Sequence, residues 1–288
     1  MAVVGFLLLI FLLRNLDYSY IKNFQFSLTF GNIVILLLII FFIFIIRTIR
    51  WMLYLKSIGI QINFTDAYHI VVPSIALALI TPAQTGDLLK VELLKKRKNI
   101  ARRDSVATVL IEKLMDFLLI FVVFLISVGY FSLKVISFNY TTTIIAFLVG
   151  IIFLFIAFNF FSRRKSIFMR VLKNTKKIMR NFKIMFYTSI LTGIYWVAIC
   201  LSLLYVARIV NIDIAFFPLF GILSIGTIMG LLSLIPGALG VIEYSMVFLL
   251  NTFMSIPINQ ATIFALSFRI YSLIMYVIAY SHLLLRKS

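Results

Sequence analysis

The sequence predicts an all-α, polytopic integral membrane protein. Hydrophobic residues make up 63% of the 288 residues and charged residues only 12%, whereas soluble domains average roughly 25% charged residues. The mean hydropathy is +1.14. Apolar runs of about 18 residues or more, the length of a membrane-spanning helix, recur from one end of the chain to the other. We therefore expect one membrane domain over residues 1–288 and no soluble catalytic domain.

The apolar runs predict the elements in order. A short first span covers 2–13, which lacks the basic start and the cleavage site of a signal peptide. The segment 66–80 is apolar but short, and it contains Pro73. The other predicted spans are 28–46, 106–131, 141–161, 184–207, 214–235, 241–254 and 261–285.

The basic residues predict the orientation of these spans. The segments 47–65, 84–113, 162–183 and 286–287 contain 22 of the 27 Lys and Arg residues, which places them, and the C-terminus, on the cytoplasmic side of a cell membrane. Both ends of 66–80 then lie on one side, so this segment is expected to be re-entrant within protein or around a water-filled cavity. The net charge of +18 is explained by orientation and by attraction to anionic lipids, not by nucleic-acid binding.

Two passages resemble each other and predict an internal repeat. Both read Pro-x-x-x-Gly with an acid just downstream, namely Pro82, Gly86 and Asp87 in the first passage and Pro236, Gly237, Gly240 and Glu243 in the second. A long apolar span with a cation, Lys113 or Arg269, follows each. Charge bias orients the two halves oppositely, which predicts inverted repeats over 28–161 and 184–285, joined by the basic amphipathic segment 162–183. Matching interrupted helices are typical of a transporter's binding site. The second hairpin either re-enters from the outer face or crosses fully.

Charges inside the predicted spans need partners. Glu112 and Asp116 are four residues apart and share a helical face, so they repel each other and require a cation. Lys113 lies on another face, and Arg50 or Arg269 from a different helix could supply this cation. The network could lock helices together, or it could bind a substrate.

Motifs for catalysis and metal binding are missing from the sequence. It contains no phosphate-binding loop, no His-Glu-x-x-His and no Cys-x-x-Cys. His69 and His282 are far apart in sequence and are expected at interfaces. Asp87 and Glu92 could in principle hold a metal, but the neighbouring Lys90 and Lys95 favour solvated charge. We expect no enzyme activity, no cofactor and no metal.

The order of these motifs resembles the lysylphosphatidylglycerol synthase transmembrane-region family, also described as a flippase-like domain. The residues that carry the resemblance are Arg47-Thr-Ile-Arg50-Trp51, Thr81 to Lys90, Glu112-Lys113-Leu-Met-Asp116, Pro236 to Glu243, and Arg269 in the last span. Family members typically have Arg where this chain has Gln84. The resemblance implies a stand-alone helical domain, without the aminoacyltransferase domain of fused members, that moves a lipid headgroup between leaflets.

These observations predict a membrane lipid translocase of inverted-repeat architecture. In this prediction Arg50, Lys90, Lys113 and Arg269 attract a lipid phosphate, and the four acids Asp87, Glu112, Asp116 and Glu243 hold these cations in place. Its expected partners are anionic membrane lipids. The alternative is a non-transporting membrane partner of an envelope-lipid or glycosylation enzyme. A third reading, a transferase acting on lipid-linked sugars, would depend on Asp87.

Overall fold

The computed structural model describes residues 2–14, 16–135 and 165–284, and every regular element in this part is a helix. The span predicted at 141–161 and the start of the basic segment at 162–164 lie outside the described residues. Five helices of the described part are long and apolar enough to cross a membrane. The prediction of an all-α polytopic membrane protein is confirmed.

The first elements are α1 (Ala2–Arg14), α2 (Tyr18–Asn23) and α3 (Phe30–Ser57). Helix α1 has 13 residues, a length of about 20 Å, which is less than the roughly 30 Å of a bilayer's hydrocarbon core. It packs against α11 (Val241–Met254). The short apolar helix predicted at 2–13 is present, and its described length is below that of a full crossing. Helix α3 has 28 residues and is long enough to cross the bilayer.

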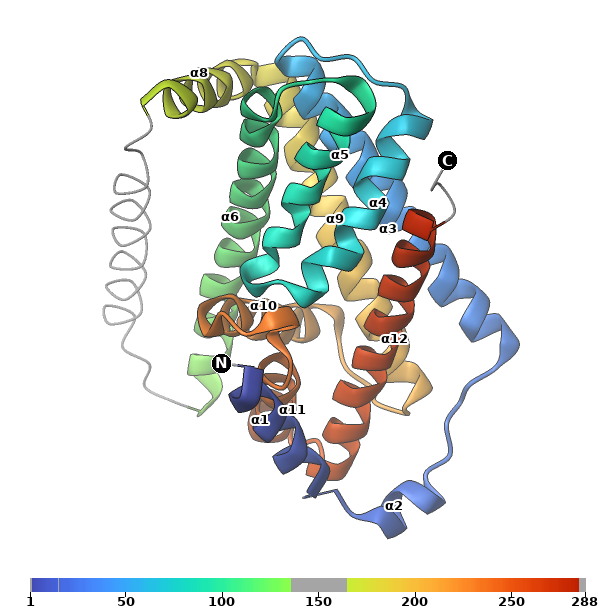
Figure 1. Cartoon of the computed structure of the whole chain (residues 1–288). Helices are drawn as coiled ribbons and strands as arrows, with labels where there is room; N and C mark the ends of the chain where they lie inside the picture. The colour runs from blue at the N-terminus through green and yellow to red at the C-terminus, as the bar shows by residue number, and fades with distance from the viewer. Residues whose placement is uncertain (1, 15, 136–164, 285–288) are drawn as a thin grey trace.

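A broken hairpin follows, consisting of α4 (Phe64–Ile80), the 3₁₀ turn η1 (Pro82–Leu88) and α5 (Leu89–Lys98). The turn is held by Gly86, whose backbone N donates a hydrogen bond to Thr81 Oγ1 at 2.7 Å. A Cβ at Gly86 would overlap the α4 backbone at Leu77 and Ala78, so only glycine fits. Figure 1 shows that the hairpin begins and ends at the upper end of the bundle and that its turn lies at mid-height. The prediction that both ends of 66–80 lie on one side is wrong for that segment, because 66–80 is one leg of the hairpin and ends at mid-height, whereas the whole hairpin from α4 to α5 returns to the side on which it began.

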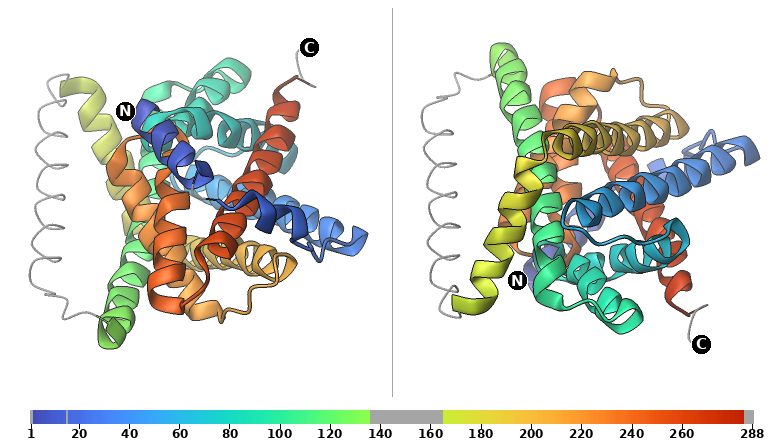
Figure 2. Two further views of the ribbon diagram at one scale, coloured as in Figure 1. Left: turned by 90° about the horizontal axis from the view of Figure 1, so that it is seen from below. Right: turned by 90° about the horizontal axis from the view of Figure 1, so that it is seen from above.

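In chain order, the amphipathic helix α8 (Lys165–Arg180) stands between two long helices, α6 (Arg102–Val135) and α9 (Phe182–Ile209). Helices α6 and α9 run through the bundle, and α8 lies across its upper end (Figure 1). Val171 and Ile178 of α8 are buried against α3 and α6, whereas the basic residues from Arg170 to Arg180 are exposed. Seen from above, α3 lies between α9 and α4 (Figure 2). The amphipathic helix predicted within 162–183 is confirmed.

The second broken hairpin contains α10 (Phe216–Ser233), the short turn η2 (Pro236–Ala238) and α11. Gly237 and Gly240 have φ values of 61° and 78°, which glycine adopts more readily than other residues. Helix α12 (Ile258–Leu284) then returns to the end of the bundle that carries α8 (Figure 1). The η1 and η2 turns contact each other. The two helix breaks thus meet inside the bundle.

Large apolar side chains cover the outside of the bundle. Phe30 of α3 is 83% exposed and Val277 of α12 is 69% exposed. Exposed apolar surface on this scale marks a contact with membrane or protein, and here it lies on helices long enough to span. This surface is suited to contact with lipid, whereas many ionisable residues lie inside the bundle.

Candidate functional site

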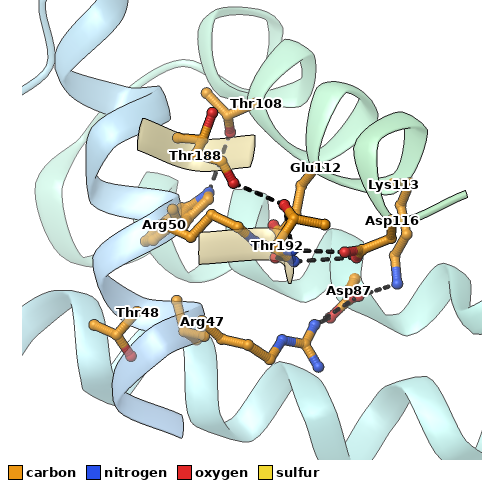
Figure 3. A network of polar contacts seen from close by, with 12 residues as sticks. Arg47, Thr48, Arg50, Asp87, Thr108, Glu112, Lys113, Asp116, Thr188 and Thr192 are labelled. Atoms are coloured by element: carbon orange, nitrogen blue, oxygen red, sulfur yellow. Dashed lines mark hydrogen bonds and ion pairs between the residues drawn. The ribbon is translucent and has the colours of Figure 1, made fainter. Parts of the chain in front are cut away.

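Seven ionisable side chains gather where α3, the first hairpin and α6 meet (Figure 3). We call this group the buried cluster, and it consists of Arg47, Arg50, Asp87, Lys90, Glu112, Lys113 and Asp116.

Arg50 is the centre of the buried cluster and its side chain is 0% exposed. Its Nη2 donates to Glu112 Oε1 at 2.8 Å and its Nη1 donates to Asp116 Oδ1 at 2.6 Å. Nη1 also donates to Thr192 Oγ1 of α9 at 3.1 Å. The two acids of α6 therefore share one cation from another helix, as their spacing predicts. Of the two cations expected for this role, the structure brings Arg50 and not Arg269.

Asp87 is the second centre and is only 1% exposed. Arg47 Nη2 donates to both of its carboxylate oxygens at 3.0 Å, and Lys113 forms an ion pair with the same carboxylate. Lys90, 0% exposed, donates to Glu112 Oε2 at 2.6 Å. The expectation of solvated charge at Asp87 and Lys90 is wrong, because the hairpin folds both side chains inward, where α3 and α6 supply opposite charges.

Arg47 and Tyr195 belong to the site although the sequence analysis did not assign them to it. The Arg47 and Arg50 guanidinium carbons lie 5.7 and 5.1 Å from the centre of the Tyr195 ring, close enough for cation–π attraction. Arg47 could have been assigned from the sequence, because it lies three residues before Arg50 on the same helix. Tyr195 lies in an ordinary apolar span and carries no comparable signal.

The second hairpin holds a smaller charged site, the Glu243–Arg269 pair. Arg269 Nε donates to Glu243 Oε1, and its Nη1 donates to the Gly237 carbonyl at 3.3 Å. Glu243 Oε2 accepts a hydrogen bond from the Gly240 backbone N at 2.7 Å. The pair therefore satisfies backbone groups that the helix break leaves unpaired.

The two charged sites share a spacing. Arg269 follows Glu243 by 26 residues, and Lys113 follows Asp87 by the same number, 113 minus 87. Asp87 lies within the first break and Glu243 lies in the first turn after the second, and in each case the cation stands on the next long helix. This equality strengthens the resemblance between the two passages.

A cavity of about 150 Å³ lies between the two breaks. It is lined by Thr81 and Gln84 of the first break, Gly237 of the second, and the Glu243–Arg269 pair. Tyr195 and Trp196 of α9 form another part of its wall.

The buried cluster reaches this cavity through a bridge. Lys113 Nζ donates to Gln84 Oε1 at 2.9 Å, and Gln84 lines the cavity. Of the predicted site residues, Gly237, Glu243 and Arg269 line the cavity directly, whereas the other predicted residues of the two breaks do not. Arg50, Lys90 and Glu112 are buried behind the wall and do not line it.

The structure also brings the two histidines together. The ring centres of His69 and His282 are 6.3 Å apart, at the end of the bundle where α4 begins and α12 ends. Among the residues that the structure describes, no three His, Cys, Asp or Glu residues are grouped to hold a metal ion.

Comparisons with known proteins agree with the membrane architecture. A UPF0104 membrane protein of Methanocaldococcus jannaschii is 28% identical over 186 residues, which are 60% of this chain and 77% of that protein. The family model described as the lysylphosphatidylglycerol synthase TM region matches residues 1–279. The chain therefore belongs to the family of lysylphosphatidylglycerol synthase transmembrane regions.

Proposed function

We propose that this protein is a lipid translocase that moves the headgroup of an anionic phospholipid or a lipid-linked glycan between the two leaflets. One observation carries the proposal: two helix breaks meet at a cavity lined by Gln84, Glu243 and Arg269 inside an apolar bundle. Ionisable groups and irregular backbone inside the apolar part of a membrane protein are costly, and they usually belong to a transport pathway.

The arrangement of the two hairpins supports this function. Discontinuous helices from two inverted repeats form the substrate sites of many transporters. The equal acid-to-cation spacing supports repeats over 28–161 and 184–285, linked by 162–183. The exposed basic residues of α8 lie at the upper end of the bundle, toward which α12 runs (Figure 1), and this supports a cytoplasmic position for the C-terminus.

The size of the cavity limits the mechanism. Its volume of about 150 Å³ is below the roughly 300–1,000 Å³ of sites that enclose drug-sized ligands. A phosphate group fits such a space, but a whole lipid does not. We infer that the headgroup passes along the polar wall while the acyl chains stay in the bilayer, or that the hairpins separate during transport. Neither route needs a catalytic residue or a cofactor.

Reconstitution in liposomes tests the proposal. The full chain would be inserted into vesicles containing fluorescent phosphatidylglycerol or phosphatidylcholine, and the loss of fluorescence after external reduction would report transfer between leaflets. We expect transfer above that of empty vesicles, and a fall of about 10-fold in Arg269→Gln, because a charge-assisted hydrogen bond of typical strength is lost from the pathway. Lys56→Gln, an exposed position on α3, is the matched control.

Two results would contradict the proposal. Wild-type vesicles that are no faster than empty ones, for every lipid tested, would remove transport as the function. A membrane enzyme that co-purifies equally with wild type and Arg269→Gln would then favour a non-transporting partner.

A further inference from the structure

The buried cluster contains more positive than negative charge. Its cations are Arg47, Arg50, Lys90 and Lys113, and its acids are Asp87, Glu112 and Asp116. Four cations face three carboxylates, so one positive charge is in excess. An uncompensated charge away from water is costly, and proteins balance it with a counter-charge.

No other acid of the chain is placed to balance this charge. All nine acidic residues of the sequence lie in the described part. Those outside the buried cluster are engaged elsewhere or lie at the surface: Asp66 with Lys98, Glu92 with Arg102, Asp104 with Arg170, Glu243 with Arg269, Asp17 with Ser19, and Asp213 exposed. Among the described residues no further acid faces the buried cluster, so an anion bound from outside the protein can supply the missing negative charge.

The excess charge is accessible at one point. Lys113 is 30% exposed, whereas its partner Asp87 is 1% exposed. Lys113 also donates to Gln84 Oε1, and Gln84 lines the cavity. Gln84 has a φ of 57°, a backbone conformation that costs energy for a residue other than glycine. An anion in the cavity beside Gln84 would be within reach of the Lys113 ammonium.

The wall behind this point contains two of the cluster's arginines. The Nε atoms of Arg47 and Arg50 are buried and have no hydrogen-bond partner among the described residues. The Tyr195 ring, which lines the cavity, covers both guanidinium groups. Each guanidinium therefore keeps one unpaired N–H donor behind this ring, in addition to its bonds to carboxylates.

We propose that the cavity contains a binding site for one singly charged anionic headgroup, a phosphodiester, next to Gln84 and Lys113. Its negative charge neutralises the buried cluster. This assignment rests on the proposed translocase function and deepens it by naming the substrate class. A lipid of net charge −1 satisfies the site, whereas a zwitterionic lipid brings its own cation toward Arg269 and Lys113 and is bound less well.

Binding of short-chain lipids to the full chain in neutral detergent tests the proposal without requiring transport. The probes are dihexanoyl phosphatidylglycerol and dihexanoyl phosphatidylcholine, and thermal stabilisation at increasing lipid concentration gives the apparent affinity. We expect wild type to bind phosphatidylglycerol about 10-fold more tightly, the size of one charge-assisted hydrogen bond. Lys113→Gln should lose this preference.

Two variants keep the test decisive. Lys113→Arg retains the charge and should retain the preference, whereas Lys56→Gln removes one exposed charge and should leave the preference unchanged. Equal binding of the two lipids by wild type, no binding of either, or an unchanged preference in Lys113→Gln would overturn the assignment.

The binding test and the transport test fail separately. Transport of both lipids at equal rates, with no binding preference, would leave the translocase proposal standing and remove the headgroup assignment. A clear preference for phosphatidylglycerol in a protein that transports nothing would retain the binding site and remove the proposed function.

Discussion

The buried cluster and the Glu243–Arg269 pair lie at the two helix breaks, and in both an acid is paired with a cation 26 residues later in the chain, Asp87 with Lys113 and Glu243 with Arg269. The two sites differ in the number of charged side chains and in whether these side chains line the cavity. Helix α3 adds two arginines to the first site, which is buried except at Lys113 and, to a lesser extent, Asp116. At the second site one cation serves one acid and the pair lines the cavity. The difference shows that similar local elements can yield a structural network in one half and an accessible polar wall in the other.

The largest effect should come from breaking the buried cluster at its centre. Arg50→Met leaves Glu112 and Asp116 buried without their shared cation, and we expect a loss of about 3–5 kcal/mol in the free energy of unfolding. Unfolding in mixed micelles measures this. The matched control is Arg102→Met, whose ion pair with Glu92 is exposed and should contribute little. Equal stability of the two variants would show that burial does not distinguish the two ion pairs.

A smaller effect is expected at the Glu243–Arg269 pair, where Arg269 is 12% exposed. Arg269→Met should cost about 1.5–3 kcal/mol, because the Glu243 carboxylate loses a charged hydrogen-bond donor. The double variant Glu243→Met with Arg269→Met should recover most of that stability, since removing both charges leaves neither unpaired. Transport should remain lost in the double variant. Recovery of transport together with stability would assign the pair a structural role alone.

The first helix break offers a third test. In Gly86→Ala the new methyl group overlaps the backbone of Leu77 and Ala78, and we expect a loss of about 1–3 kcal/mol, as for other overpacked sites. Gly193→Ala is the matched control, because a Cβ there meets no atom within 4 Å. That change should be neutral or slightly stabilising in a helix. Equal thermal midpoints for the two variants would show that the hairpin can move apart at little cost.

The smallest effect concerns the exposed ion pair of Glu92. A hydrogen bond from Arg102 holds the pKa of Glu92 below its ordinary value of 4.5. A lowered pKa stabilises the folded protein above the ordinary value, and this contribution disappears as the pH falls through the lowered pKa. Wild type and Glu92→Gln should therefore differ slightly in thermal midpoint at pH 7 and converge below pH 4.5. A difference that grows on acidification would contradict this sign.

Much of the fold could be predicted from local patterns. Helix α3 was expected to include 28–46 and covers Phe30–Ser57, because its apolar run is long and uninterrupted. The breaks at Pro82 and Pro236 were predicted because proline and glycine interrupt helices. Asp87 and Lys90 were misjudged, since their neighbours in sequence are basic and solvated whereas their neighbours in space are acids and arginines of other helices.

The sequence by itself determined that the chain lies in a membrane, where its helices break, and that Glu112 and Asp116 need a cation. These properties follow from hydropathy, backbone stereochemistry and the repulsion of like charges at helical spacing. Only the tertiary structure decided that Arg50 supplies this cation, that Tyr195 covers two arginines, and that Lys113 and Gln84 meet beside a cavity. Such pairings join residues that are far apart in the chain, and a local pattern cannot specify which helices become neighbours.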